Sequence, residues 1–329
     1  MEIYTRCHVV WRRVLIKKRK VNSGGMKVLE DGFLLTVLEE GDKLFHYTSA
    51  DGLQGIVGGE FWITESHFLN DITEFQVATE VFCEVLNCKL KNAEIRERIK
   101  KAVCEENNRL SAYGQIGEEV AYFGDYVISF CLERDSILLW SEYSDFCGYC
   151  IEFDFDKLLS SFPKPNEIMH GKVIYSHEDQ LSLMIRTIEN EFFKNSVGYD
   201  YLTSWEDMDK LTDKQIKEIV PHMGVVVSGY NMFFKKECFA GENEYRFIFT
   251  CCHDGGRYKD EEREKQYFRV KNGVLIPFVK QPLSSLESVR SILIGPKNNS
   301  DIAVKGVEYF LRNHKIRVPV EKSKMPLRY

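Results

Sequence analysis

Three charged residues alternate along one predicted strand late in the chain. Glu242, Glu244 and Arg246 stand two positions apart, so their side chains would share one face of a strand. Two carboxyl groups this close separate their pKa values, which lets one of them act as an acid or a base. Arg246 could neutralise one carboxylate or bind a phosphate through two hydrogen bonds. The alternative is a ladder of charges that pair across an edge strand, without catalysis.

A second polar group surrounds His46. His46 is followed by Tyr47 and Thr48 at the end of a predicted strand, and the next strand carries Trp62 after a short helix and a glycine turn. A lone histidine is more often a satisfied core residue than a ligand. Because its neighbours all carry hydrogen-bonding side chains, we favour a polar pocket that binds a small ligand.

Two further candidates flank these groups. Asn70 and Asp71 precede a predicted helix; we expect Asp71 or Thr73 to cap this helix and Asn70 to point toward the pocket. Tyr143 follows Trp140 by three residues on one helical face. We expect Trp140 in the core, with Tyr143 either beside it or stacked on a base.

The ten cysteines are scattered and most lie within apolar patterns. They are therefore expected to act as small apolar residues in a reducing compartment. Cys147–Cys150 is formally a C-x-x-C motif, and Cys251, Cys252 and His253 could complete a zinc site. However, residues three apart on a strand point to opposite faces, and no metal is expected.

Composition limits the class of protein. The chain has 329 residues, 44% of them hydrophobic, and a net charge of −6; this mild acidity argues against a protein that coats DNA non-specifically. No apolar run reaches the length of a membrane span, and no signal-peptide pattern opens the chain, so a cytoplasmic protein is expected. Residues 1–25 are strongly basic, which indicates either an arm for nucleic acid or membrane surfaces or a poorly ordered extension.

Predicted strands frame the chain, and helices are inserted between them without a regular alternation. This order predicts an α+β fold with a mixed or antiparallel central sheet. We expect an N-terminal extension over residues 1–43 and a single domain over 44–329, with helical insertions near 73–113 and 177–240. Within the second insertion, two helices are expected to meet at Pro221.

The order of several motifs resembles the bacterial family catalogued as domain of unknown function 2971. The motifs are Leu44–Ser49, Phe61–Thr64, Phe68–Asp71, Ser129–Phe130, Trp140–Tyr143, Gly148–Asp154, Glu242–Arg246, Ile292–Pro296 and Ser323–Arg328. The family name carries no activity.

A more distant resemblance, to ADP-ribosyltransferase-like folds, implies one. His46 with Thr48, then Trp62, then Glu242-x-Glu244 are similar to the order of functional residues in those folds. The resemblance implies that His46 and Thr48 hold the nicotinamide ribose and amide, that the aromatic residue stacks on nicotinamide, and that the last glutamate binds a ribose hydroxyl. Trp62 replaces the usual tyrosine.

Together these features predict an enzyme that uses NAD, either as an ADP-ribosyltransferase or as an NAD glycohydrolase. Glu244 would stabilise the developing cation and Glu242 would deprotonate the acceptor. The predicted nucleotide-binding residues are His46, Tyr47, Thr48, Trp62, Asn70, Tyr143 and Arg246.

Bacterial proteins of this kind act as toxins or anti-phage effectors, so a protein or nucleic-acid acceptor and an inhibitory or sensor partner are expected by analogy. Two alternatives stay open. One is a non-catalytic module that senses a nucleotide or a partner; the other is a metal-dependent nuclease that uses Asp71, Glu74 and the Glu242/Glu244 pair.

Overall fold

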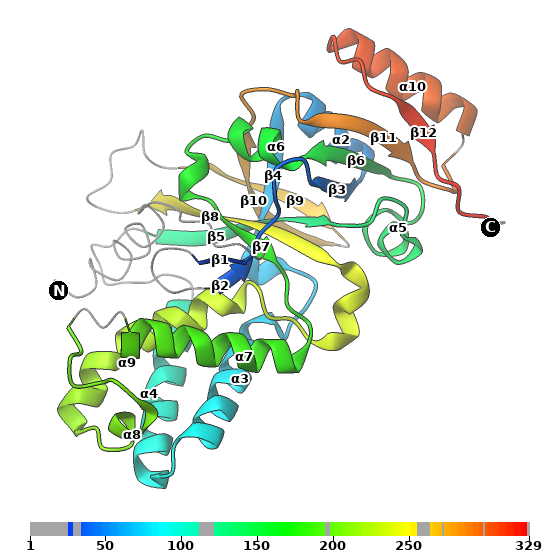
Figure 1. The fold of residues 1–329 in the computed structure, drawn as a ribbon. Coiled ribbons are helices and arrows are strands. Elements are labelled where there is room, and N and C mark those ends of the chain that lie inside the picture. The colour runs from blue at the N-terminus through cyan, green and yellow to red at the C-terminus, as the bar shows by residue number, and fades with distance from the viewer. Residues whose placement is uncertain are drawn as a thin grey trace.

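The computed structural model describes residues 26–28, 34–111, 122–194, 198–254, 264–271, 273–298 and 300–327. A mixed sheet of ten strands runs through the middle of the molecule, with helices on both sides (Figure 1). The α+β class predicted from the sequence is confirmed. The segment 1–25, for which a basic arm or extension was expected, lies outside the described residues.

Most strands of the sheet pair with antiparallel neighbours. The strands are β3 (Lys43–Thr48), β4 (Glu60–Glu65), β5 (Tyr122–Cys131), β6 (Tyr149–Asp154), β7 (Met169–Lys172), β8 (Glu244–Asp254), β9 (Gln266–Lys271), β10 (Val274–Pro282), β11 (Val289–Ile294) and β12 (Val320–Lys322). Their order is β12-β11-β6-β3-β5-β4-β10-β9, and β8 joins β5 to β7. The pair β11–β12 is parallel, which makes the sheet mixed. A separate hairpin is formed by β1 (Met26–Val28) and β2 (Leu34–Thr36).

The helices divide between the two sides of the sheet. They are α2 (Ala50–Val57), α3 (Glu74–Lys89), α4 (Ala93–Ser111), α5 (Ile137–Ser144), α6 (Phe155–Ser161), α7 (His177–Ile188), α8 (Trp205–Met208), α9 (Asp213–Asn231) and α10 (Ser300–Asn313). Shorter turns are η1 (Ser66–Phe68), η2 (Pro165–Glu167), η3 (Glu189–Lys194) and η4 (Glu237–Glu242). Helices α3, α4, α7, α8 and α9 gather on one side (Figure 1), so the two predicted insertions form one helical layer.

The helix boundary expected at Pro221 was wrong. Helix α9 continues through Pro221 from a capping box at Thr212 and Gln215. Proline lacks the backbone N–H and normally interrupts a helix. Here Ile219 and Met223, on either side of it, are 0% and 1% exposed. Because both are packed in the helical layer, tertiary burial holds the helix together across the proline.

The packed unit begins before residue 44. Leu34 and Leu35 are fully buried against the helices α3, α7 and α9, while Leu38 belongs to the core on the other side of the sheet. The boundary of the domain therefore lies before Leu34, because these side chains complete both cores.

Strands β3 and β4 diverge where they meet β5. Strand β3 pairs with β5 at Phe45 and Cys131, whereas β4 pairs with it farther back, at Thr64 with Val127. Between these two contacts, the middle of β5 faces the opening between β3 and β4. On its other edge β5 pairs with β8 over ten positions. This split places β3, β5 and β8 side by side at the candidate site.

Candidate functional site

Five charged side chains meet in the interior of the molecule. Glu74 begins α3, Lys235 follows α9, Glu242 ends η4, and Glu244 and Arg246 lie on β8. None of the five is more than 6% exposed. We call them the charge cluster. Because removal of a charge from water costs several kcal/mol on its own, each member needs an oppositely charged partner.

Arg246 is the most constrained member. It donates two parallel hydrogen bonds to Glu74, from Nη1 to Oε2 at 3.0 Å and from Nη2 to Oε1 at 2.7 Å. Nη2 also donates to Glu244 Oε2 at 2.8 Å, and Nη1 to the carbonyl oxygen of Met232 at 3.0 Å. The guanidinium therefore joins α3, the end of α9 and β8. Both terminal nitrogens are engaged within the protein, unlike those of an arginine that is free to bind phosphate.

Lys235 connects the three carboxylates. Its Nζ lies 2.5 Å from Glu242 Oε2, and 3.6 Å from both Glu74 Oε1 and Glu244 Oε2. Burial alone would lower the pKa of Lys235, but the surrounding carboxylates, chiefly Glu244, raise it above its ordinary value. Lys235 is therefore a buried cation at the centre of the site.

The two glutamates near β8 have pKa values shifted in opposite directions. Burial and the adjacent Glu244 charge raise the pKa of Glu242. Burial opposes ionisation of Glu244 too, yet Arg246 and Lys235 lower its pKa below the ordinary value. Three carboxylates face two cations, so the fully ionised charge cluster carries one excess negative charge. Of the two glutamates near β8, Glu242 therefore takes up a proton more readily than Glu244, which stays ionised.

Two tyrosines lie beside the glutamates. Burial, followed by the negative charge of Glu244, raises the pKa of both Tyr143 and Tyr175, so both phenols stay neutral. The backbone N–H of Glu244 donates to the Tyr175 hydroxyl at 3.0 Å. Tyr143 reaches the site from α5 and is half-buried. The structure thus brings Tyr143 together with the glutamates.

The carboxyl groups of Glu242 and Glu244 lie close together, but not because the two residues alternate along one strand. Glu242 ends η4, and β8 begins only at Glu244. Asn243 between them has a φ of 42°, in the left-handed region that asparagine tolerates better than most residues. The expectation that both glutamates lie on one strand was wrong; a turn at Asn243 directs both carboxyl groups to Lys235.

His46 is a neutral imidazole that bridges two strands. Its Nδ1 lies 2.9 Å from the carbonyl oxygen of Ser129 on β5. Since a carbonyl only accepts hydrogen bonds, Nδ1 carries the proton. Burial lowers the pKa of His46 to about 4, although the Ser129 bond partly opposes this shift. His46 is therefore uncharged near neutral pH, and it binds across the split between β3 and β5.

The His46 ring and the Glu244 carboxylate lie on opposite faces of the sheet. The ring packs against Phe61 and Phe130, with 5.5 Å between ring centroids in each pair. Phe130 shares a core with Tyr245, the neighbour of Glu244 on β8. Adjacent strand residues point to opposite faces, so Glu244 points away from that core.

Ser129 connects the two faces. Its carbonyl oxygen accepts from His46, while its hydroxyl group hydrogen-bonds to Glu244 and helps to lower the pKa of that carboxyl. The structure therefore relates His46 to the charge cluster through Ser129 rather than by direct contact.

The other residues predicted beside His46 have separate surroundings. Tyr47 packs against Trp140 at 4.8 Å between centroids, and its hydroxyl accepts from the Ser136 N–H at 2.8 Å. Thr48 is buried against the first turn of α2, where Gly52 leaves room for its hydroxyl. Asn70 is exposed on the surface.

Asp71, also considered in the loop before α3, forms a local turn there. The Thr73 N–H donates to Asp71 Oδ1 at 2.8 Å, and the Thr73 hydroxyl donates to the same oxygen at 2.7 Å. This is an Asx turn. Thr73 is the N-cap residue of α3 but makes no side-chain hydrogen bond to the helix backbone, so the helix cap expected from Asp71 or Thr73 does not form.

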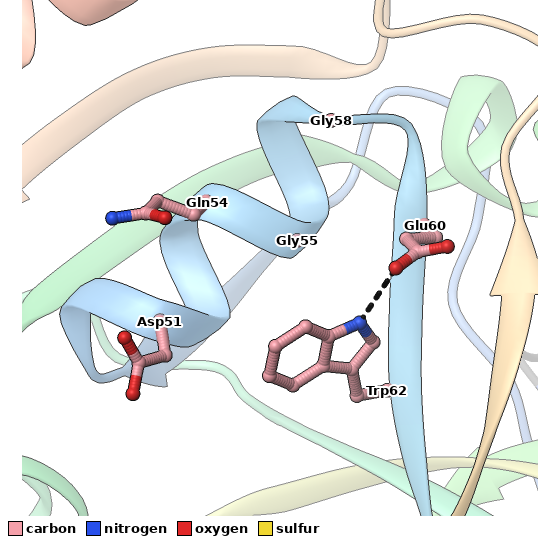
Figure 2. A pocket seen from close by; sticks show the side chains of 6 residues that line it. All are labelled: Asp51, Gln54, Gly55, Gly58, Glu60 and Trp62. Carbon is pink, nitrogen blue, oxygen red and sulfur yellow. Dashed lines mark hydrogen bonds between the residues drawn. The ribbon is translucent and has the colours of Figure 1, made fainter. Parts of the chain in front are cut away.

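Trp62 lines a pocket of about 270 Å³ between α2 and β4 (Figure 2). The lining residues are Asp51, Gln54, Gly55, Gly58, Glu60 and Trp62. The indole Nε1 donates to Glu60 Oε1 at 2.9 Å, and the same oxygen accepts from Lys280 at 2.6 Å. Since α2 and β4 supply no residue of the charge cluster, Trp62 belongs to a different site from Glu244.

Lys235 and Tyr175 were missed in the sequence, and Glu74 was considered only for a nuclease. The sequence does contain a signal for Lys235, because this residue directly follows the apolar run Met232–Phe234. A charged residue next to such a run is buried when the run packs into the core. Glu74 could be read as the first residue of a helix. Its pairing with Arg246, 172 residues away, could not be inferred from spacing.

The fold and site thus define an α+β protein with a buried cluster of glutamate, lysine and arginine. Residues 139–247 match the family model described as "Protein of unknown function (DUF2971)". The match confirms the family resemblance over that segment, which contains Lys235, Glu242, Glu244 and Arg246. Comparisons with curated proteins and with solved structures found no match.

The helices of the described residues were also compared with the requirements of a membrane span. Among the described residues, none of the helices combines the length and the apolar character needed to cross a bilayer.

Proposed function

We propose that this protein is an enzyme that cleaves the N-glycosidic bond of NAD and passes ADP-ribose to a macromolecule or to water. One observation carries the proposal. The carboxyl groups of Glu242 and Glu244 meet at Lys235, and their pKa values are shifted in opposite directions. Glycosidic cleavage uses two carboxyl groups with different protonation states, one for proton transfer and one for charge stabilisation.

Glu244 suits the electrostatic role. Arg246 and the Ser129 hydroxyl fix its position and keep it ionised. A carboxylate held rigidly in a buried site stabilises a developing oxocarbenium ion more than a mobile, solvated one does. The predicted role of Glu244 as the cation-stabilising residue is therefore retained in the proposal.

Glu242 suits proton transfer to or from the acceptor. Its raised pKa brings it closer to neutral pH, where a general base works best. It ends the short helix η4 beside the turn at Asn243 and, although buried, is the most exposed member of the charge cluster at 6%. In this proposal Glu242 deprotonates the acceptor hydroxyl or water.

Tyr143 is proposed to contact the nucleotide, since its half-buried aromatic ring lies on the side of the glutamates. His46 is proposed to act as a positioning residue, because it reaches Glu244 through Ser129. By analogy with the distant resemblance, the acceptor is a protein or nucleic acid, and the biological role is that of a toxin or anti-phage effector under the control of a partner.

A binding module without turnover is the second candidate, and the Trp62 pocket supports it. An indole edge, two carboxylates and an amide side chain line this pocket, a combination that can bind a small polar ligand. The metal-dependent nuclease has less support. Lys235 and Arg246 already neutralise Glu74 and Glu244, and Asp71 is engaged with Thr73.

The experiment is incubation of the purified protein with NAD, followed by chromatographic detection of free nicotinamide. Glu244→Gln preserves the shape but removes the charge, and should lower the rate about a hundredfold. Glu242→Gln should impair transfer to an acceptor while sparing hydrolysis. Glu152→Gln, at a buried carboxylate outside the cluster, is the matched control and should keep the wild-type rate.

Three outcomes would contradict parts of the proposal. If wild-type protein binds NAD, as measured by a thermal shift, but releases no nicotinamide, the binding module is favoured. If Trp62→Ala abolishes the NAD-induced thermal shift but Tyr143→Ala does not, the nucleotide binds in the Trp62 pocket. Nicotinamide release that survives both glutamate substitutions would return the charge cluster to a structural role.

A further inference from the structure

Two cysteines from neighbouring helices touch on the helical side of the sheet. Cys83 on α3 and Cys104 on α4 place their sulfur atoms 3.8 Å apart, within hydrogen-bonding distance for thiols. Both side chains are half-buried, so small reagents can reach them. This placement differs from the apolar filling role that the sequence suggested for the cysteines.

The surroundings make the two thiols unequal. The hydrogen bond from Cys83, helped by the nearby Lys100 ammonium group, lowers the pKa of Cys104 to about 7 against the effect of its burial. The same hydrogen bond, together with burial, raises the pKa of Cys83. Cys104 is one helical turn from Lys100. At neutral pH a large fraction of Cys104 is therefore thiolate, the reactive form, while Cys83 stays a thiol beside it.

We propose that Cys83 and Cys104 form an oxidisable dithiol whose substrate class is peroxides, and that the product is a disulfide between α3 and α4. The Cys104 thiolate attacks hydrogen peroxide, so an S–O bond forms, the O–O bond breaks, and hydroxide leaves and takes up a proton. Cys83 then attacks the resulting sulfenic acid. The S–S bond forms, the S–O bond breaks, and water leaves with the Cys83 proton. The two sulfur atoms lose two electrons, and peroxide is reduced to two molecules of water.

The bond would join helices that already pack together. Asn107 of α4 donates to the Thr79 hydroxyl of α3 at 2.8 Å, on the same helix pair. A disulfide from Cys83 to Cys104 closes the loop that contains the turn between the helices, and loop closure stabilises a folded protein chiefly by restricting its unfolded chain. This inference is independent of the proposed NAD chemistry.

The test uses the purified, reduced, full-length protein and hydrogen peroxide. After oxidation, remaining thiols are alkylated and the protein is digested without reduction. The expected product is one cross-linked pair of peptides that contains Cys83 and Cys104 and is lighter by two hydrogen atoms than the reduced pair. The oxidised protein should also unfold at a higher urea concentration, and reduction should reverse the shift.

Variants separate this site from ordinary thiol oxidation. Cys83→Ser should leave a sulfenic acid at Cys104 that dimedone traps, whereas Cys104→Ser should leave Cys83 unreacted. Cys88→Ser removes an exposed thiol on the same helix and, as the matched control, should not change the cross-link. In reduced wild-type protein at pH 7, iodoacetamide should modify Cys104 at least about tenfold faster than Cys83.

Equal or faster alkylation of Cys83 would overturn the assignment of Cys104 as the attacking sulfur. Oxidation of the exposed Cys88, Cys147 or Cys238 before any Cys83–Cys104 cross-link forms would overturn the site itself. These two readouts use wild-type protein, so they decide the proposal even where a serine variant does not fold.

Discussion

Two groups of ionised residues lie on the sheet, and they differ mainly in their access to water. The charge cluster is buried at β8. The second group, which we call the surface ladder, spans β3, β6 and β11: Lys43 Nζ lies 2.7 Å from Glu152 Oε1, and the Ser291 hydroxyl donates to Glu152 Oε2 at 2.7 Å. The Lys43 side chain is 62% exposed although that of Glu152 is only 10% exposed, whereas in the charge cluster the cation is buried too, with Lys235 3% exposed.

The protonation of a glutamate differs accordingly. In the surface ladder, burial of Glu152 is outweighed by hydrogen bonds from Lys43 and Ser291, which lower its pKa. In the charge cluster, burial and the neighbouring Glu244 raise the pKa of Glu242 despite a shorter contact with Lys235. An excess of buried carboxylates over cations thus yields a group suited to proton transfer, while a single buried carboxylate bonded to an exposed lysine and a hydroxyl group stays ionised.

The largest expected difference between the two groups is in stability. Arg246→Met removes the arginine that hydrogen-bonds to Glu74 and Glu244 and leaves three buried carboxylates facing Lys235 alone, so it should lower the free energy of unfolding by about 3–5 kcal/mol. Arg134→Met, beside the surface ladder, should cost less than about 1 kcal/mol. Urea denaturation of both variants measures this, and equal losses would show that burial does not distinguish the groups.

The second-largest effect is expected from His46, which should make the free energy of unfolding strongly dependent on pH. Its pKa falls from 6.5 to about 4 on folding, so the unfolded chain takes up a proton first as the pH drops. Stability should therefore decline between pH 6.5 and pH 4, by up to about 3 kcal/mol. His46→Gln should flatten this part of the curve. The check is the difference between wild-type and variant unfolding free energies across that range; a constant difference contradicts a neutral, buried His46.

Glu242 should show a pH dependence of the opposite sign. Its pKa is raised on folding, so the stabilisation from its protonated form is present below pH 4.5 and is lost as the pH rises through the folded value. Glu242→Gln should therefore gain stability relative to wild type between pH 4.5 and pH 8. The corresponding change at Glu244, whose pKa is lowered, should lose stability relative to wild type as the pH rises from the folded value toward 4.5, and should differ from wild type by a constant amount above that pH. The same trend in both variants would refute the division between them.

The smallest effect is expected in the surface ladder. Lys43→Ala removes an exposed partner of Glu152, and should change the free energy of unfolding by less than about 1 kcal/mol because water screens the pair. Added salt should reduce that small difference further. If Lys43→Ala lowered the free energy of unfolding as much as Arg246→Met does, water would not screen Lys43 as the exposure of its side chain indicates.

Local patterns in the sequence were sufficient for the secondary structure and the class of fold. Apolar periodicity placed α3 and α4 closely, and alternation placed β5, β6 and β8, because these signals depend on neighbours within a few residues. The pattern Glu242-x-Glu244-x-Arg246 also identified three members of the charge cluster. Pro221 led to the wrong prediction of a helix boundary, because the buried face of α9 holds the helix together across a residue that normally interrupts one.

The sequence by itself determined that the protein is α+β, that residues 139–247 resemble one family of unknown function, and that glutamates and an arginine gather near residue 244. Only the tertiary structure decided which charges meet. Glu74 and Lys235 join the cluster because α3 and the end of α9 pack against β8, while His46 faces the opposite side of the sheet. Spacing fixes the direction of a side chain within its own strand or helix, but contacts between distant segments depend on how the layers pack.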